Sequence, residues 1–132
     1  MEHRQFTLEE ANALVPWLEE TFQRLGRVGE EHGVLHTRLN ELLRQRGSNG
    51  SSSSSEEMDQ AQENVDRLAR LLQEGVQEIL DRGIIVRDVV RGLVDFPSQR
   101  EAREVYLCWI GGEERIEFWH ETDRGFAHRE PL

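Results

Sequence analysis

The sequence contains no lysine, one cysteine, three prolines and few aromatic residues, and each shortage excludes something. All 16 basic residues are arginine and the net charge is −10, so the chain lacks the surplus of cations that non-specific binding to nucleic acid or anionic lipid requires. We therefore expect neither nucleic acid nor a membrane surface as a main partner. No run approaches the roughly 18 consecutive apolar residues of a membrane-spanning helix.

The cellular compartment follows from two further absences. Cys108 has no second cysteine to pair with, which excludes an internal disulfide. The first residues also lack the apolar run of a secretory signal peptide. Both absences predict a reducing compartment, the cytoplasm. A chain of 132 residues can bury a hydrophobic core, and we expect one domain over residues 1–132.

Two stretches have the apolar pattern of a helical hairpin. The first opens with Thr7 and Glu10, which can exchange hydrogen bonds as a capping box, and its apolar residues then recur at alternating steps of four and three, as in coiled coils. We expect this helix over residues 7–46, with a kink or short break near Pro16, which has no amide hydrogen to donate. Serine-rich residues 47–55 predict a flexible loop, and a second capping box from Ser54 to Glu57 opens a matching helix over 56–82.

Three glycines, Gly26, Gly29 and Gly33, lie beside the apolar seam of the first helix. Each costs about 1 kcal/mol relative to alanine inside a helix. Two interpretations stay open: a second backbone approaches closely at these positions, or the helix is locally weak. An antiparallel hairpin would place Gly29 opposite Gly75, which favours the close approach.

After Gly83 the seven-residue repeat of apolar positions gives way to alternation at every second residue, which predicts strands. We expect a four-stranded antiparallel meander within residues 84–120, followed by a tail over 121–132. Pro97 should end the second strand, because proline cannot donate to a ladder. The fold class is therefore α+β: a long antiparallel helical hairpin followed by a four-stranded antiparallel β-meander, with one sheet face packed on the start of the first helix.

The register of the last predicted hairpin depends on its turn. Glycine at the first central position favours a two-residue turn at Gly112 and Glu113, which pairs Gly111 with Glu114. This register places His120 on the same sheet face as Leu107.

The last third of the chain also carries a series of specific motifs: residues 92–97, residues 107–109, Gly112-Glu113, Trp119-His120, Gly125-Phe126, Arg129 and Pro131. Together with Phe6-Thr7 and Glu10-Ala11 near the start, they resemble the bacterial domain-of-unknown-function family numbered 2203. The similarity spans nearly the whole chain apart from the serine loop, and His128 departs from the glycine expected there. The resemblance implies a small bacterial protein, and it supplies no activity.

One group of polar residues is a candidate metal site. Asp95, Glu113 and His120 come from three segments that the meander could bring together, and a histidine with two carboxylates can hold a divalent metal. Asp88, Asp123 and Cys108 lie in neighbouring strands or turns. No recognisable ligand spacing supports a metal, so we favour a buried histidine and aspartate satisfied by backbone or arginine partners.

Other candidates have simpler interpretations. His32 and His36 are spaced for two metal ligands on one helix, but they lack the intervening glutamate of a zinc-protease helix, and His32 occupies a seam position. Cys108 has no recognisable Cys-His signature, which favours a packed strand residue over a nucleophile. Four arginines near the predicted sheet edges and tail are expected to form internal ion pairs with the abundant acidic residues: Arg100, Arg103, Arg124 and Arg129.

Two functions stay open. The favoured one is a non-enzymatic interaction or assembly module that forms a homo-oligomer without a cofactor, because two long seams and a two-sided apolar sheet exceed what one small domain can cover. The alternative is a small metal-binding protein or metal-dependent enzyme that uses Asp95, Glu113 and His120.

Overall fold

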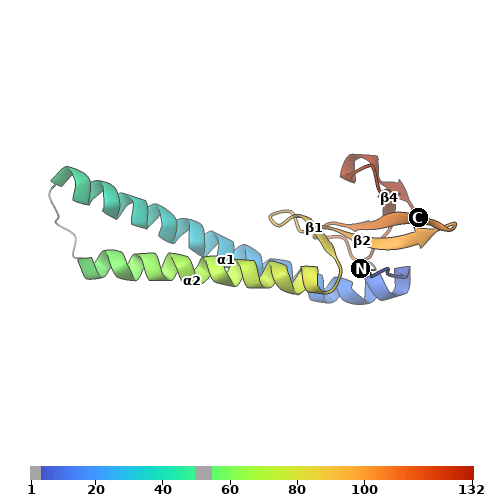
Figure 1. Ribbon diagram of the computed structural model, residues 1–132, viewed down its shortest axis with the longest axis horizontal. Helices are drawn as coiled ribbons and strands as arrows, with labels where there is room; N and C mark the ends of the chain where they lie inside the picture. Colours follow the sequence, from blue (N-terminus) through green and yellow to red (C-terminus); the bar gives the residue numbers. More distant parts are fainter. Residues whose placement is uncertain (1–3, 50–54) are drawn as a thin grey trace. The chain divides into compact units, whose positions relative to one another are not determined.

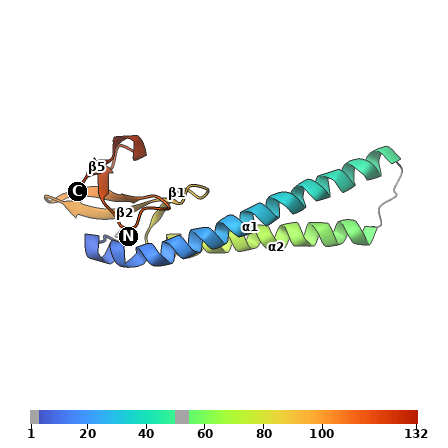
Figure 2. The ribbon, with the colours of Figure 1, turned by 180° about the vertical axis from the view of Figure 1, so that it is seen from behind.

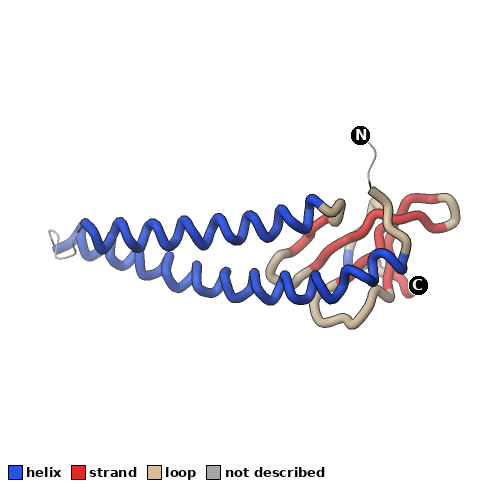
Figure 3. Tube along the Cα trace, turned by 90° about the horizontal axis from the view of Figure 1, so that it is seen from below, coloured by secondary structure: helices blue, strands red, loops and turns tan. Residues whose placement is uncertain are grey.

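Two helices precede an antiparallel sheet in the computed structural model, which describes residues 4–49 and 55–132 (Figure 1). The elements are α1 (Leu8–Asn49), α2 (Ser55–Asp81), β1 (Ile85–Asp88), β2 (Leu93–Arg100), β3 (Arg103–Trp109), β4 (Phe118–Glu121), the 3₁₀ helix η1 (Phe126–His128) and β5 (Glu130–Pro131). The strands pair in sequence order. Figure 3 colours the strands red and the helices blue. The predicted α+β class is confirmed, but the prediction of four strands is wrong, because the sheet has five.

The middle of the chain, Arg24–Glu74, is a compact helical unit. In it α1 and α2 run antiparallel (Figure 2), and the residues buried between them recur at helical spacing: Leu25, Leu39 and Leu42 from α1, and Met58, Val65 and Leu68 from α2. The first helix was expected over 7–46 and extends to Asn49. Most of the predicted serine loop, and Ser54 of the second capping box, lie outside the described residues.

The glycine stripe of α1 does not mark a close backbone contact. A Cβ atom added at Gly26 or Gly33 would meet nothing within 4 Å, and one added at Gly29 would meet only the Cδ2 atom of Leu72, at 4.0 Å. The register argument that favoured close approach was therefore wrong, and the second interpretation, a local weakness of the helix, agrees with this geometry.

A second compact unit combines the start of α1, up to Gln23, with the chain from Gly75 onward. The helix begins at the predicted capping box: the Thr7 amide donates to Glu10 Oε1 at 2.9 Å, and the Glu10 amide donates to Thr7 Oγ1 at 3.1 Å. These hydrogen bonds from Thr7 lower the pKa of the Glu10 carboxyl. The helix then continues through Pro16 without a break.

One face of the sheet packs against this first part of α1. The rings of Phe22 and Trp109 stack with centroids 6.3 Å apart, and the Ile116 amide donates to Asn12 Oδ1 at 2.7 Å. Phe96, on the same sheet face as Trp109, is fully buried and meets the Phe6 ring edge to face at 5.1 Å. This apolar interface fixes which sheet face is turned away from α1.

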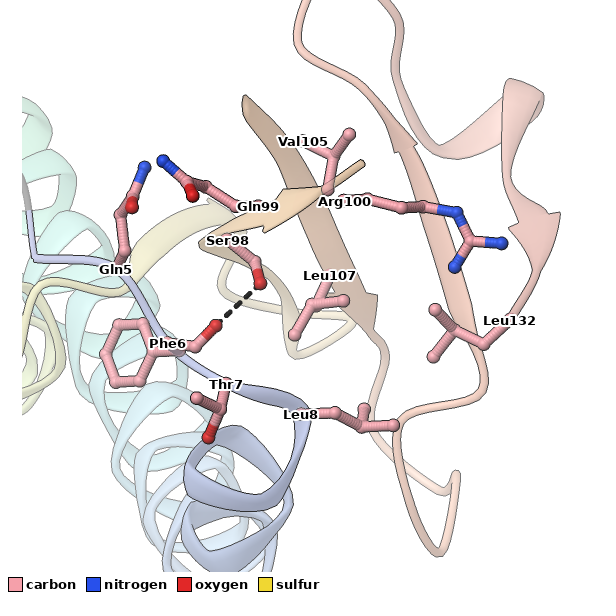
Figure 4. A pocket seen from close by; sticks show the side chains of 10 residues that line it. All are labelled: Gln5, Phe6, Thr7, Leu8, Ser98, Gln99, Arg100, Val105, Leu107 and Leu132. Atoms are coloured by element: carbon pink, nitrogen blue, oxygen red, sulfur yellow. Dashed lines mark hydrogen bonds between the residues drawn. The ribbon is translucent and has the colours of Figure 1, made fainter. Parts of the chain in front are cut away.

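The segment before α1 lies along β2. The Phe6 amide donates to the Pro97 carbonyl at 2.7 Å, and Ser98 Oγ donates to the Phe6 carbonyl at 2.6 Å (Figure 4). The prediction that Pro97 ends its strand was wrong, since β2 continues to Arg100. Pairing with β1 reaches only Asp95, so Pro97 lies on an edge where a missing amide hydrogen costs no ladder bond.

The pairing of β3 with β4 differs by one residue from the predicted register. Tyr106 pairs with His120 and Leu107 with Trp119. No two-residue turn joins these strands, because residues 110–117 form a longer connection in which the side chain of Glu113 accepts from the Ile110 amide at 2.9 Å. A slip of one residue turns every side chain to the opposite face. His120 therefore lies on the face that is turned away from Leu107.

The expected tail contains the fifth strand. Pro131 of β5 pairs with Phe118 of β4, and the Leu132 amide donates to the Glu117 carbonyl at 2.9 Å. The guanidinium of Arg129 lies 4.1 Å from the ring centroid of Phe118 and 4.3 Å from that of Phe126. These contacts cover β4, which would otherwise be an open edge of the sheet.

Candidate metal centre

Three neighbouring strands bring an aspartate, a cysteine and a histidine together on the sheet face turned away from α1. Asp95 of β2 is directly paired with Cys108 of β3, and His120 of β4 is paired with Tyr106, two residues before Cys108. All three side chains are buried, with 2%, 0% and 1% of their surface exposed. One carboxylate oxygen, the sulfur and one ring nitrogen all lie within 4.8 Å of one another.

Hydrogen bonds hold each of these groups in one orientation. The Nε2 atom of His120 lies 2.9 Å from Asp95 Oδ1, and its Nδ1 atom lies 2.8 Å from the Glu121 carbonyl. A carbonyl oxygen only accepts, so Nδ1 carries a hydrogen and Nε2 is the atom that faces the cluster. Arg87 Nε donates to the other carboxylate oxygen, Asp95 Oδ2, at 2.9 Å.

The side-chain nitrogen and oxygen atoms of Asp95 and His120 all have hydrogen-bond partners within the protein. Each ring nitrogen of His120 lies within hydrogen-bond distance of an oxygen atom, Nδ1 at the Glu121 carbonyl and Nε2 at Asp95 Oδ1. Within residues 4–49 and 55–132, no buried side-chain nitrogen or oxygen atom lacks a hydrogen-bond partner. A cation at this place would therefore replace the proton shared by Nε2 and Asp95 Oδ1 rather than fill an unsatisfied gap.

The thiol of Cys108 is held in its protonated form. Its pKa is raised from 9.0 to about 12, chiefly by burial and also by the nearby Asp95 carboxylate, while Arg129 opposes the rise. The thiol is therefore a poor nucleophile at neutral pH. A divalent cation would reverse this balance, because a coordinating thiol loses its proton.

Of the three residues proposed from the sequence, Asp95 and His120 meet, and Glu113 lies elsewhere. Glu113 accepts from Arg129 Nη1 through both carboxylate oxygens, at 3.1 and 3.2 Å, in the connection between β3 and β4. Asp88 is also separate, since it accepts from the Arg91 amide at 3.1 Å. Cys108, and not Glu113, is the third member of the cluster. Only the correct register of β3 and β4 would have indicated that Cys108 lies beside His120.

A cavity of about 430 Å³ adjoins the cluster. Its lining residues come from β1, β2, β3 and the segment between β4 and β5: Arg87, Leu93, Asp95, Cys108, Thr122, Asp123, Arg124, Gly125 and Phe126. Because Asp95 and Cys108 have almost no exposed surface while residues 122–125 are exposed, the two ligand candidates lie at the inner end of the cavity.

A second cavity of about 440 Å³ lies beside the segment before α1 (Figure 4). Its polar lining consists of Gln5, Thr7, Ser98, Gln99 and Arg100, and its apolar lining includes Leu8, Val105, Leu107 and Leu132. It contains no histidine, cysteine or carboxylate side chain, so we do not regard it as a metal site.

Most of the remaining sequence candidates have structural partners. The rings of His32 and His36 stack with centroids 5.8 Å apart on α1, and the described part of the chain places no third ligand beside them. Of the four arginines expected to form internal ion pairs, Arg103 pairs with Glu121 at 3.0 Å and Arg129 pairs with Glu113 at 3.1 Å. The expectation is wrong for Arg100 and Arg124, which form no ion pair within the described residues. Arg100 instead lies 4.8 Å from the ring centroid of Trp119.

Comparison with known proteins identifies a family for this chain but gives no activity. One family model matches residues 4–132, and it is described as an uncharacterized conserved protein, DUF2203. No curated protein and no solved structure matches the chain. No helix in the described residues has the length and apolar character to cross a bilayer.

Proposed function

Since the chain belongs to the DUF2203 family of uncharacterized conserved proteins, we propose its function from geometry: it binds a divalent cation of the zinc type through Asp95, Cys108 and His120. One observation carries the proposal. Three different kinds of ligand atom, from three adjacent strands, converge within 4.8 Å in a buried place beside a cavity.

The surroundings of the three ligands fit a metal centre. A histidine that binds a metal usually donates its other ring N–H to a carbonyl or carboxylate, and His120 donates Nδ1–H to the Glu121 carbonyl. Ligating carboxylates are themselves hydrogen-bonded, and Arg87 holds Asp95 Oδ2 while Oδ1 faces the cluster. These outer contacts orient the ligand atoms in advance.

The donor set favours zinc over magnesium or calcium. Thiolate and imidazole are ligands of borderline and soft metals, whereas magnesium and calcium prefer oxygen throughout. Three protein ligands leave one position of a tetrahedral centre open, as in catalytic zinc sites. Zinc at about 2.0 to 2.1 Å from both Nε2 and Oδ1 would separate these two atoms to about 3.3 Å. This is a few tenths of an ångström more than their present 2.9 Å.

A chelator competition tests this proposal. Zinc would be titrated into a mixture of the protein and a chromophoric chelator, and the wild type should take up one tight equivalent. Loss of an outer partner of a metal ligand weakens binding by about 10- to 100-fold. Cys108→Ser and His120→Asn should each weaken binding by at least this factor, because each removes a ligand. The matched control is His36→Ala, which breaks the stacked histidine pair on α1 and should keep the tight equivalent. Equal affinity in the wild type and Cys108→Ser would exclude the site.

A second proposal, self-association, is favoured by one surface of the helical unit. Val34 is 69% exposed on α1, and it lines a groove with Gly29, Gly33 and Thr37. A second copy of the chain would cover this apolar surface as a symmetric dimer. Light scattering coupled to size exclusion should give a dimer for the wild type and a monomer for Val34→Glu. A monomeric wild type at tens of micromolar would reject this second proposal.

A further inference from the structure

We propose that the cavity beside the metal centre binds a small oxyanion, a carboxylate or a phosphate, with one oxygen completing the coordination of the metal. This inference rests on the proposed zinc-type centre and names the ligand class of its open position. The cavity of about 430 Å³ is near the lower end of the range for small-molecule sites, so the ligand has few atoms. Asp95 and Cys108 at its inner end place that ligand next to the metal.

Two arginines supply the positive side of this cavity. Arg87 donates to Asp95 through Nε, and its two terminal amino groups make no hydrogen bond to any residue of the described chain. The Arg124 side chain forms no ion pair with residues 4–49 or 55–132. A guanidinium group matches the two oxygens of a carboxylate or phosphate, so both side chains have donors available for an oxyanion.

The charge balance at the cavity points to an anion in spite of the acidic composition of the chain. Asp123 also lines the cavity and opposes Arg124. With a divalent cation in place, the cation and the two arginines carry four positive charges. Asp95, Asp123 and the Cys108 thiolate carry three negative charges, which leaves an excess of one positive charge. One monovalent oxyanion would neutralise this excess.

The apolar part of the cavity lining accommodates the rest of the ligand. Phe126 lines the cavity together with Leu93, and its ring is covered by Arg91 at 4.8 Å and Arg129 at 4.3 Å from the ring centroid. These two cations hold the aromatic ring in place. A ligand with an anionic head and a short apolar body therefore fits better than a sugar or a second cation.

Cobalt(II) makes the ligand exchange visible, because its visible absorption bands change when a coordinating group changes. Cobalt-loaded protein would be titrated separately with inorganic phosphate and with acetate. We expect a saturable change of the bands, and the anion that binds more tightly identifies the source of the oxyanion. Arg124→Gln should weaken anion binding by about tenfold, the loss of one charged hydrogen bond. The matched control is Arg115→Gln, which removes an exposed pair with Glu117 outside the cavity and should bind as the wild type does.

The outcomes separate this inference from the proposed function. Protein that gives no cobalt spectrum overturns the metal centre and this inference with it. A normal cobalt spectrum that responds to neither phosphate nor acetate overturns this inference alone. Equal anion affinity in Arg124→Gln and the wild type also overturns it, since the arginines would then take no part.

Discussion

Replacing His120 with alanine should destabilise the metal-free protein strongly. The substitution removes the hydrogen bond to Asp95 at 2.9 Å and the one to the Glu121 carbonyl at 2.8 Å. It also empties a site that is 1% exposed and takes away the edge contact with the Tyr106 ring at 5.6 Å. A hydrogen bond to a charged group contributes about 1.5 to 3 kcal/mol, and with the cavity we expect a total loss of about 3 to 4 kcal/mol.

Urea unfolding in the presence of a chelator measures this loss. Trp17, Trp109 and Trp119 all belong to the same compact unit as His120, so tryptophan fluorescence reports on the unfolding of that unit. The matched control is His128→Ala, which changes an exposed histidine and should stay within about 0.5 kcal/mol of the wild type. A loss below about 1 kcal/mol for His120→Ala would refute the buried hydrogen-bonded arrangement on which the site depends.

Three further predictions concern Gly33, the turn between β2 and β3, and Cys108. Gly33→Ala should raise the free energy of unfolding by about 1 kcal/mol, because a Cβ there meets nothing within 4 Å, and a lower thermal midpoint would contradict this. Glu101 and Ala102 have φ of 53° and 62°, so replacing them with Asn and Gly should stabilise the β2–β3 turn by about 1 kcal/mol, and an unchanged midpoint would reject this. Native metal-free Cys108 should resist iodoacetamide at pH 8, whereas unfolded protein reacts. The pKa of Cys108 rises from 9.0 to about 12 on folding, so between pH 9 and 12 the thiol ionises in the unfolded protein and stays protonated in the folded one. The free energy of unfolding should therefore fall as pH rises from 9 to 12.

Local sequence signals predicted both helices and four of the five strands. The capping box of Thr7 and Glu10 depends only on residues three apart, and both of its hydrogen bonds form. The apolar spacing of α1 likewise predicted residues that are buried between the helices, such as Leu25 and Leu39. His120 is buried next to Asp95, and Arg87 donates to the same carboxylate.

The site could not be predicted because its neighbours depend on contacts distant in the chain. The connection over residues 110–117 is held by Asn12 of α1 as well as by Glu113, and these contacts replace the short turn that the glycines favoured. The resulting shift of one residue moves His120 next to Cys108. The fifth strand has only two residues and is defined by its pairing with β4. The sequence alone shows neither effect.

X-ray absorption spectroscopy of the zinc-loaded protein tests the central claim most directly, because it identifies the atoms bound to the metal. The proposed centre predicts one sulfur at about 2.3 Å, together with nitrogen and oxygen neighbours at about 2.0 to 2.2 Å. Cys108→Ser should lose the sulfur shell, while His36→Ala should keep it. A zinc environment without sulfur in the wild type would contradict a centre built from Asp95, Cys108 and His120.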